Sequence, residues 1–135
     1  MKRKAYGFIH CHTDHSLRDG AMNAKAITLT DHGTCTGWIE FMKTCKKLNI
    51  NGIPGVEAYV KTEYEPRAHL VLLAKDEIGY RAICRAVTKS NMNQRTVAKV
   101  NTSVMTKDLL TECFSGGHVI ALSACINGVI GSIFL

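Results

Sequence analysis

The stretch AITLTDHGTCTGWIEFMKTCKKLNINGIPGVEAYV, residues 26–60, decides the fold class of this chain. Its first part, Ala26–Thr30, is short, apolar and partly β-branched, which predicts a strand. A helix is expected next, over Thr36–Leu48, because apolar side chains recur there every three or four residues. These side chains are Trp38, Phe41, Met42, Cys45 and Leu48. Asn and Gly residues end the helix, and Ile53–Val60 predicts another strand. The stretch therefore predicts a strand–helix–strand unit.

Further strands and helices are predicted on both sides of this unit. They are strands over Ala5–His10, Ala68–Ala74 and His118–Ser123, and helices that begin at Asp76 and span Lys107–Phe114. The near-continuous apolar run Ala68–Ala74 is typical of a strand covered on both faces. Asp76 can cap its helix, and residues 89–106 carry no clear pattern. Alternating strands and helices predict an α/β fold with a largely parallel sheet.

Composition and charge limit the function classes. The chain has 135 residues, which predicts one domain over 1–135. Its net charge of +6 and pI near 9.1 favour anionic partners such as nucleic acid or phosphate esters, although the basic residues are spread along the chain. No apolar run is long enough for a membrane span or a signal peptide, so a cytoplasmic protein with no membrane association is expected. Six cysteines without a CxxC pair are then expected to stay reduced.

Residues of the types that bind metal ions stand near the predicted strand ends. They are His10, His12, Asp31, His32, Glu57, His69 and Cys125, with Asp19 in the first loop. Imidazoles, carboxylates and a thiolate together suit zinc, manganese or iron. Paired ions lower the pKa of a bound water and hold the oxygens of a phosphoryl group. We therefore expect His10, His12, Glu57 and His69 to converge at one end of the sheet.

Each of these residues alone also has a simpler explanation. A His-x-His pair is usually a surface pair, and Asp31 can be the capping residue of a turn. Glu57 can be a solvated strand residue, and His69 a hydrogen-bonded core histidine. Cys125 can be a small buried apolar residue, the common fate of a free cysteine. Only the joint pattern favours a metal site.

Four blocks of the sequence resemble the PHP (polymerase and histidinol phosphatase) domain of bacterial DNA polymerase III alpha subunits. The blocks are FIHCHTDHSLRDGAM (8–22), the stretch 26–60, HLVLLAKDEIGYRAICR (69–85) and VIALSACINGVIG (119–131). They follow one another in the family's order and cover most of the chain. The resemblance implies a distorted or incomplete β/α barrel, related to the TIM barrel, whose strand ends hold up to three divalent ions. Zinc, manganese and magnesium are the implied ions, with iron as a further option.

The resemblance also implies roles for single residues. The implied metal ligands are His10, His12, Asp19, His32, Glu57, His69 and Cys125. Catalytic roles are implied for Glu57, His12 and Asp31, and Asp31 is expected to orient its neighbour rather than to bind an ion. The chain departs from the family pattern in two ways. Only residues 23–25 separate the first turn from the strand at Ala26, so one early helix is missing, and the C-terminal part of the family fold, with its final Asp-x-His motif, is absent.

Three functions are compatible with these residues. The leading hypothesis is the PHP domain of a polymerase III alpha-like protein in DNA replication. Its chemistry would be that of a metal-dependent phosphoesterase of the 3′–5′ exonuclease type, impaired by the missing ligands. The partners would be a DNA 3′ end or a phosphate ester, together with subunits of the DNA polymerase holoenzyme. The alternatives are a stand-alone phosphatase for small phosphomonoesters and a non-catalytic remnant that docks on a polymerase.

Overall fold

The computed structural model describes residues 6–8, 24–93, 95–97 and 100–133. The elements in chain order are β1 (Tyr6–Phe8), β2 (Ala24–His32), α2 (Trp38–Lys47), β3 (Asn51–Val60), β4 (Ala68–Ala74), α3 (Glu77–Met92), β5 (Arg95–Val97), β6 (Val100–Thr102), β7 (Val104–Met105), α4 (Lys107–Phe114), β8 (Val119–Leu122) and η2 (Gly131–Ile133). No helix in these ranges is both long and apolar enough to cross a membrane.

The strand–helix–strand unit predicted from residues 26–60 is present. β2 continues two residues beyond Thr30, so that Asp31 and His32 belong to the strand rather than to the turn after it. α2 begins two residues later than predicted, at Trp38. Asp76 caps α3 as expected, because its Oδ1 accepts a hydrogen bond of 2.9 Å from the backbone nitrogen of Gly79. Of the strand expected over Ala5–His10, the structure describes the residues of β1, Tyr6–Phe8.

The sheet is mixed. Its strand order is β1-β2-β3-β4-β8, and β7 also pairs with β3. The β1–β2, β2–β3 and β3–β7 pairs are parallel, whereas the β3–β4 and β4–β8 pairs are antiparallel. β4 turns back because residues 61–67 are too few for a parallel crossover, which needs about a dozen residues or more. The α/β fold is confirmed, and its barrel is incomplete because the outer strands β1 and β8 do not pair with each other among the described residues.

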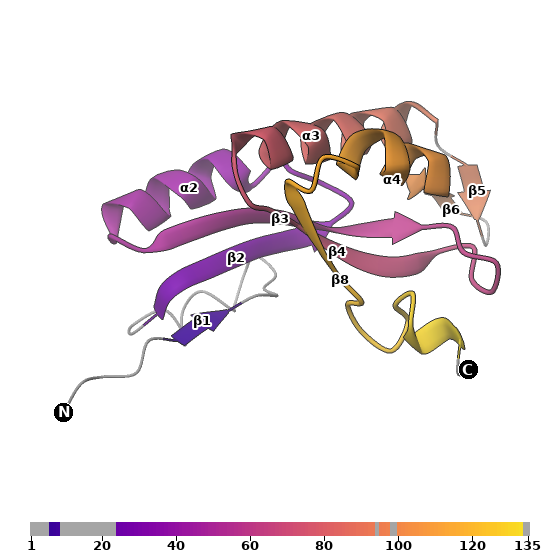
Figure 1. Ribbon diagram of the computed structural model, residues 1–135, viewed down its shortest axis with the longest axis horizontal. Coiled ribbons are helices and arrows are strands. Elements are labelled where there is room, and N and C mark those ends of the chain that lie inside the picture. Colours follow the sequence, from indigo (N-terminus) through magenta and orange to yellow (C-terminus); the bar gives the residue numbers. More distant parts are fainter. Residues whose placement is uncertain (1–5, 9–23, 94, 98–99, 134–135) are drawn as a thin grey trace.

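Helices α2, α3 and α4 cover one face of the sheet (Figure 1). Trp38, Phe41 and Cys45 of α2 and Ile83 of α3 are buried there against the apolar side chains of three strands. Those strand residues are Ile27, Leu29, Val56, Ala58, Leu72 and Ala74. The prediction that Met42 and Leu48 complete the α2 stripe is wrong, since they are 38% and 57% exposed. Leu48 is already the C-cap residue, beyond the last helical residue Lys47.

The other face of the same strands carries the polar residues. Side chains alternate along a strand, so residues two apart share a face. Thr28 and Thr30 of β2 and Glu57 of β3 therefore point away from the helices, and all three are buried. A buried carboxylate is costly unless other groups pair with it. Glu57 thus marks the part of the molecule where a site is expected.

Candidate metal centre

Strand register brings His32, Glu57 and His69 together. His32, the last residue of β2, pairs with Glu57 of β3, and Tyr59 of β3 pairs with His69 of β4. Residues directly opposite each other in a sheet share a face, and so do Glu57 and Tyr59. His69 does not follow a strand but begins one. It reaches this edge because β4 runs antiparallel to β3.

The turn after β2 fixes the position of His32. Gly33 has φ 64°, the left-handed conformation that glycine adopts without strain. Its backbone nitrogen donates a hydrogen bond of 2.9 Å to the carbonyl oxygen of Glu57. The sequence Asp-His-Gly therefore ends β2 and links that end to the strand that carries the glutamate.

The three side chains form a compact set of possible ligands. Glu57 Oε1 lies 2.5 Å from Nδ1 of His69 and 3.8 Å from Nδ1 of His32. One ligand atom from each residue lies within 4.8 Å of the other two. The side chain of Glu57 is 3% exposed, that of His69 19% and that of His32 47%, so the set opens to solvent on one side. Two imidazoles and a carboxylate fit a zinc or manganese ion, and they leave further coordination positions for water or substrate.

Cys125 lies beside this set, next to His69. Its Sγ is 3.5 Å from Nδ1 of His69. The chain returns to this point after β8, since the nitrogen of His69 donates to the carbonyl of Asn127 and the nitrogen of Val129 donates to the carbonyl of His69. A side chain at Gly128 would place its Cβ 1.7 Å from the carbonyl oxygen of Ser123, so this return requires glycine. Cys125 is exposed and can reach an ion held beside His69.

A second cysteine near the turn is unsuited to bind an ion. Burial and the neighbouring Cys84 raise the pKa of Cys35 to about 12. Metal ions bind the thiolate rather than the thiol. Cys35 therefore stays protonated, although it is only three residues from His32.

The remaining predicted site residues are not placed in this set. Asp31 precedes His32 on β2, so its side chain points to the other face of the sheet. His10, His12 and Asp19 lie outside the described residues. Their predicted roles, and the predicted catalytic role of Asp31, stay predictions.

An open cavity of about 520 Å³ lies beside the set. Its lining residues are His32, Tyr59, Tyr64, Glu65, Arg67, His69 and Asn127. Sequence reasoning missed Tyr59, whose ring is stacked on His32 with centroids 5.9 Å apart. Strand alternation from Glu57 would have found it. It also missed Arg67, whose position depends on the hairpin between β3 and β4.

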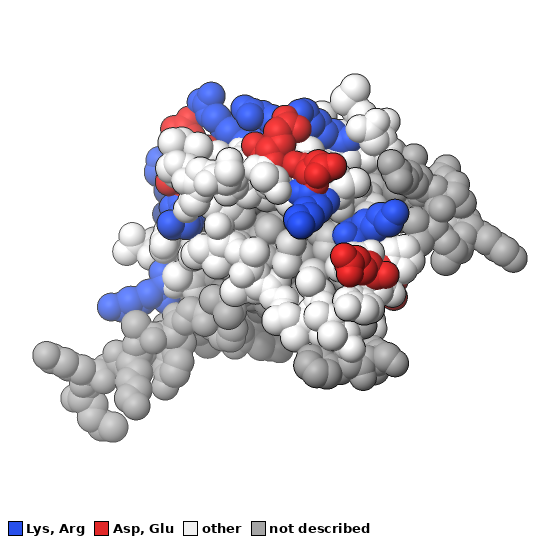
Figure 2. Space-filling view, turned by 45° about the vertical axis from the view of Figure 1, so that its right-hand side comes forward, with Lys and Arg blue, Asp and Glu red and all other residues white. Residues whose placement is uncertain are grey.

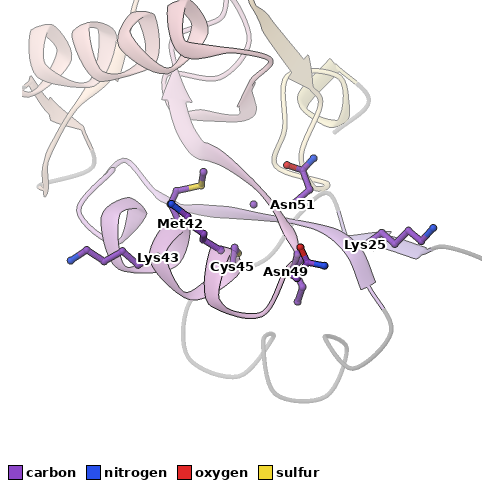
Figure 3. A pocket seen from close by; sticks show the side chains of 9 residues that line it. Lys25, Met42, Lys43, Cys45, Asn49 and Asn51 are labelled. Atoms are coloured by element: carbon purple, nitrogen blue, oxygen red, sulfur yellow. The ribbon is translucent and has the colours of Figure 1, made fainter.

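A larger hollow, of about 850 Å³, lies at the other end of the strands (Figure 3). It is lined by residues at the start of β2, the end of α2 and the start of β3, and none of them is His, Asp or Glu. Lys25 and Lys43 point away from each other in Figure 3, so their charges do not converge. The size of this hollow does not make it a metal or anion site.

The family model of the PHP domain matches residues 9–135. The chain belongs to the PHP domain family. It is 35% identical over 142 residues to the DNA polymerase III subunit alpha of Chlamydia trachomatis, which covers 89% of this chain and 11% of that protein. It is also 35% identical over 155 residues to the same subunit of Borreliella burgdorferi, which covers 98% of this chain and 13% of the relative. This PHP domain thus spans only about a tenth of the length of these relatives.

The predicted resemblance is confirmed, because the PHP domain matches the N-terminal part of DNA polymerase III alpha subunits. Among solved structures, an amidohydrolase from Chromobacterium violaceum with bound sulfate and no metal is similar, with a TM-score of 0.53 at 21% identity. The match covers 66% of this chain and 34% of that one. At this identity it supports the fold alone.

Proposed function

We propose that this PHP domain is a metal-dependent phosphoesterase of the 3′–5′ exonuclease type, with weak activity, in a cytoplasmic replication protein related to the polymerase III alpha subunit. The observation that carries the proposal is the convergence of His32, Glu57 and His69 within 4.8 Å at one edge of the sheet. The open cavity beside them gives a substrate access to the same edge. Its partners would be a DNA 3′ end and subunits of a DNA polymerase holoenzyme.

The residues present divide the work of such a site. Glu57, His69 and His32 would hold a divalent ion, with Cys125 as a further ligand beside His69. The ion would supply charge neutralisation and an acidified water for attack on a phosphodiester. Glu57 is buried between the two imidazoles, so its carboxylate is held in one orientation. His32 is the most exposed of the three and stands where the cavity opens.

Within the described residues, the possible ligands are enough for one ion. Of the family's three ion positions, the one expected from Glu57, His69 and Cys125 keeps all of its implied protein ligands in this chain. The resemblance assigns the other two positions to His10, His12, Asp19 and His32; of these only His32 lies among the described residues, and there it stands with Glu57 and His69. We therefore expect one firmly bound ion per chain.

The surface charge restricts the substrate. On the face shown in Figure 2, Lys and Arg side chains are scattered, and several lie next to Asp or Glu. The described residues on this face form no continuous basic band of the kind that tracks a duplex backbone. This face is therefore not proposed as a surface that binds duplex DNA.

Elemental analysis paired with a degradation assay tests the proposal. The purified chain is loaded with Mn²⁺ or Zn²⁺ and desalted, and its metal content is measured. It is then incubated with a 3′-labelled single-stranded DNA and, separately, with p-nitrophenyl phosphate. We expect about one ion per chain and slow, metal-dependent loss of the 3′ label. Three tightly bound ions with rapid turnover, or no bound ion, would contradict the proposal.

The same assay separates the two alternatives. Hydrolysis of p-nitrophenyl phosphate without DNA degradation would indicate a phosphatase for small phosphomonoesters. Metal binding with neither activity would indicate a non-catalytic module that docks on a polymerase.

A further inference from the structure

Arg67 has an unusual position at the cavity wall. Its guanidinium carbon lies 4.1 Å from the centroid of the Tyr59 ring, a cation–π contact. Such stacking uses a face of the guanidinium and does not engage the N–H groups of its two terminal nitrogens. Its Nε is buried and has no hydrogen-bond partner within the part of the chain that the structure describes. The Arg67 guanidinium therefore lies near the candidate metal centre, and no carboxylate among the described residues accepts a hydrogen bond from its Nε.

The support of Arg67 is rigid and is shared with the metal centre. The Tyr59 ring is stacked on His32 at an interplanar angle of 4° and meets the ring of His69 edge-on, with centroids 5.2 Å apart. Arg67, Tyr59 and the two imidazoles thus form one packed group. A group that binds to Arg67 in the cavity would share that cavity with His32 and His69.

The hairpin between β3 and β4 orders the loop that carries Arg67. The hydroxyl of Thr62 donates to the carbonyl oxygen of Glu65, and the nitrogen of Glu65 donates back to that hydroxyl at 2.8 Å. The Glu65 carboxylate accepts a hydrogen bond of 3.1 Å from the backbone nitrogen of Arg67. Glu65 is the only carboxylate among the described residues that line the cavity, and this bond directs one of its oxygens toward the loop.

Tyr64 adds an aromatic surface at the rim of the same cavity. It is 67% exposed, although it belongs to the lining residues. Exposed tyrosines next to a cationic group are the combination on which single-stranded nucleic acids bind, with bases stacked on the ring and phosphates on the cation.

We propose that Arg67 binds the phosphate and Tyr64 stacks the base of a nucleotide unit in this cavity, as substrate-binding residues beside the metal centre. The planar guanidinium presents its donors in a fork that matches two phosphate oxygens, which lysine cannot reproduce. This inference rests on the proposed function, because it names the substrate class of that same site.

Binding of two probes, inorganic phosphate and thymidine 5′-monophosphate, tests the proposal by calorimetry on the full chain, with Mn²⁺ and with EDTA. Arg67→Gln should weaken the binding of both probes about tenfold or more and leave the Mn²⁺ content unchanged. Tyr64→Leu should weaken thymidine 5′-monophosphate about tenfold, the loss typical of one base stack, and leave phosphate unaffected. The matched control is Arg81→Gln, which removes the same charge from an exposed position on α3 and should bind both probes as the parent does.

Other outcomes overturn the inference. If Arg67→Gln binds both probes within about twofold of the parent, or if the parent binds neither, Arg67 is not a phosphate-binding residue. Should Arg67→Gln fail to fold, Arg67→Lys keeps the charge without the fork, and parent-like affinity in that variant would also overturn the inference. If the parent chain does not bind Mn²⁺, the proposed function is refuted. The binding of the two probes in EDTA, compared between the parent and Arg67→Gln, would still decide the role of Arg67.

Discussion

The indole nitrogen of Trp38 donates a hydrogen bond of 2.8 Å to the carbonyl oxygen of Gly55, two residues before Glu57. Trp38 is the first residue of α2 and is 1% exposed. Its ring also packs on Tyr80 of α3, with centroids 5.0 Å apart. A single side chain therefore joins two helices to the strand that carries the carboxylate of the candidate metal centre.

Truncation of Trp38 should strongly destabilise the domain. Trp38→Ala is expected to lower the free energy of unfolding by about 3–5 kcal/mol, because it leaves a cavity between α2, α3 and the sheet. Trp38→Phe keeps most of the apolar volume but removes the hydrogen bond to the Gly55 carbonyl, at a cost of about 0.5–1.5 kcal/mol. Urea denaturation measures both, with Ile39→Ala, at a 65% exposed position, as the control. An unchanged midpoint in Trp38→Ala would contradict the packing described.

Replacement of Glu57 by glutamine should remove tight metal binding. The amide keeps the size of the side chain but removes the negative charge that faces both imidazoles. We expect the Mn²⁺ and Zn²⁺ affinities to fall at least about 100-fold, since changes outside the ligand shell already cost 10–100-fold. Titration with each ion measures the loss. Glu40→Gln, at an exposed position on α2, is the control, and an equal loss in that variant would indicate a nonspecific charge effect.

Cys125→Ser should discriminate between ions. Thiolate is a softer ligand than an alcohol, so the affinity for zinc should fall more than the affinity for manganese. Competition of the two ions in one titration measures the ratio directly. Cys113→Ser on α4 serves as the control for loss of a thiol. If both affinities fell equally, Cys125 would act only through the position of His69.

Asp76 should make part of the stability dependent on pH. The backbone N–H of Gly79 and the ring of His118, 2.7 Å from Oδ2, hold the pKa of Asp76 below its ordinary value. A carboxyl whose pKa is lowered by folding stabilises the native state above its unfolded pKa, about 3.9, and this contribution is lost as the pH falls through the folded value. Asp76→Asn keeps an N-cap side chain but removes the charge.

Urea midpoints of the parent chain and Asp76→Asn at pH 7 and pH 3 measure this effect. We expect the parent to be more stable at pH 7 and the difference to shrink below about pH 4. A difference that does not change with pH would contradict a contribution from the charge of Asp76.

Local patterns in the sequence were sufficient for most elements and for part of the site. The spacing of apolar residues every three or four positions predicted α2 and its buried Trp38. Alternation of side chains along β3 agrees with the burial of Val56 and Ala58 on the face that the helices cover. The exposure of Leu48 was missed because the stripe continues in sequence after the helix has left the sheet. Such an end depends on where the partner element stops, which no local period records.

Long-range geometry accounts for the other differences. His69 was selected as a possible ligand, but its place at the start of an antiparallel strand depends on the short hairpin of residues 61–67. The contact between Arg67 and Tyr59 forms across that same hairpin, so the identity of either residue does not predict the contact. Residue type predicted which side chains can bind an ion, and strand direction determines which of them meet.

The residues beside the cavity come from distant parts of the chain, at positions 32, 57, 69 and 125. An unfolded chain does not hold them together, so an ion that binds this set binds the native state in preference to the unfolded one. By mass action, a free ion concentration 100 times the dissociation constant would add about 2.7 kcal/mol to the free energy of unfolding. The thermal midpoint of the domain would then rise with the supply of the ion and fall with a chelator, so the midpoint would report metal availability.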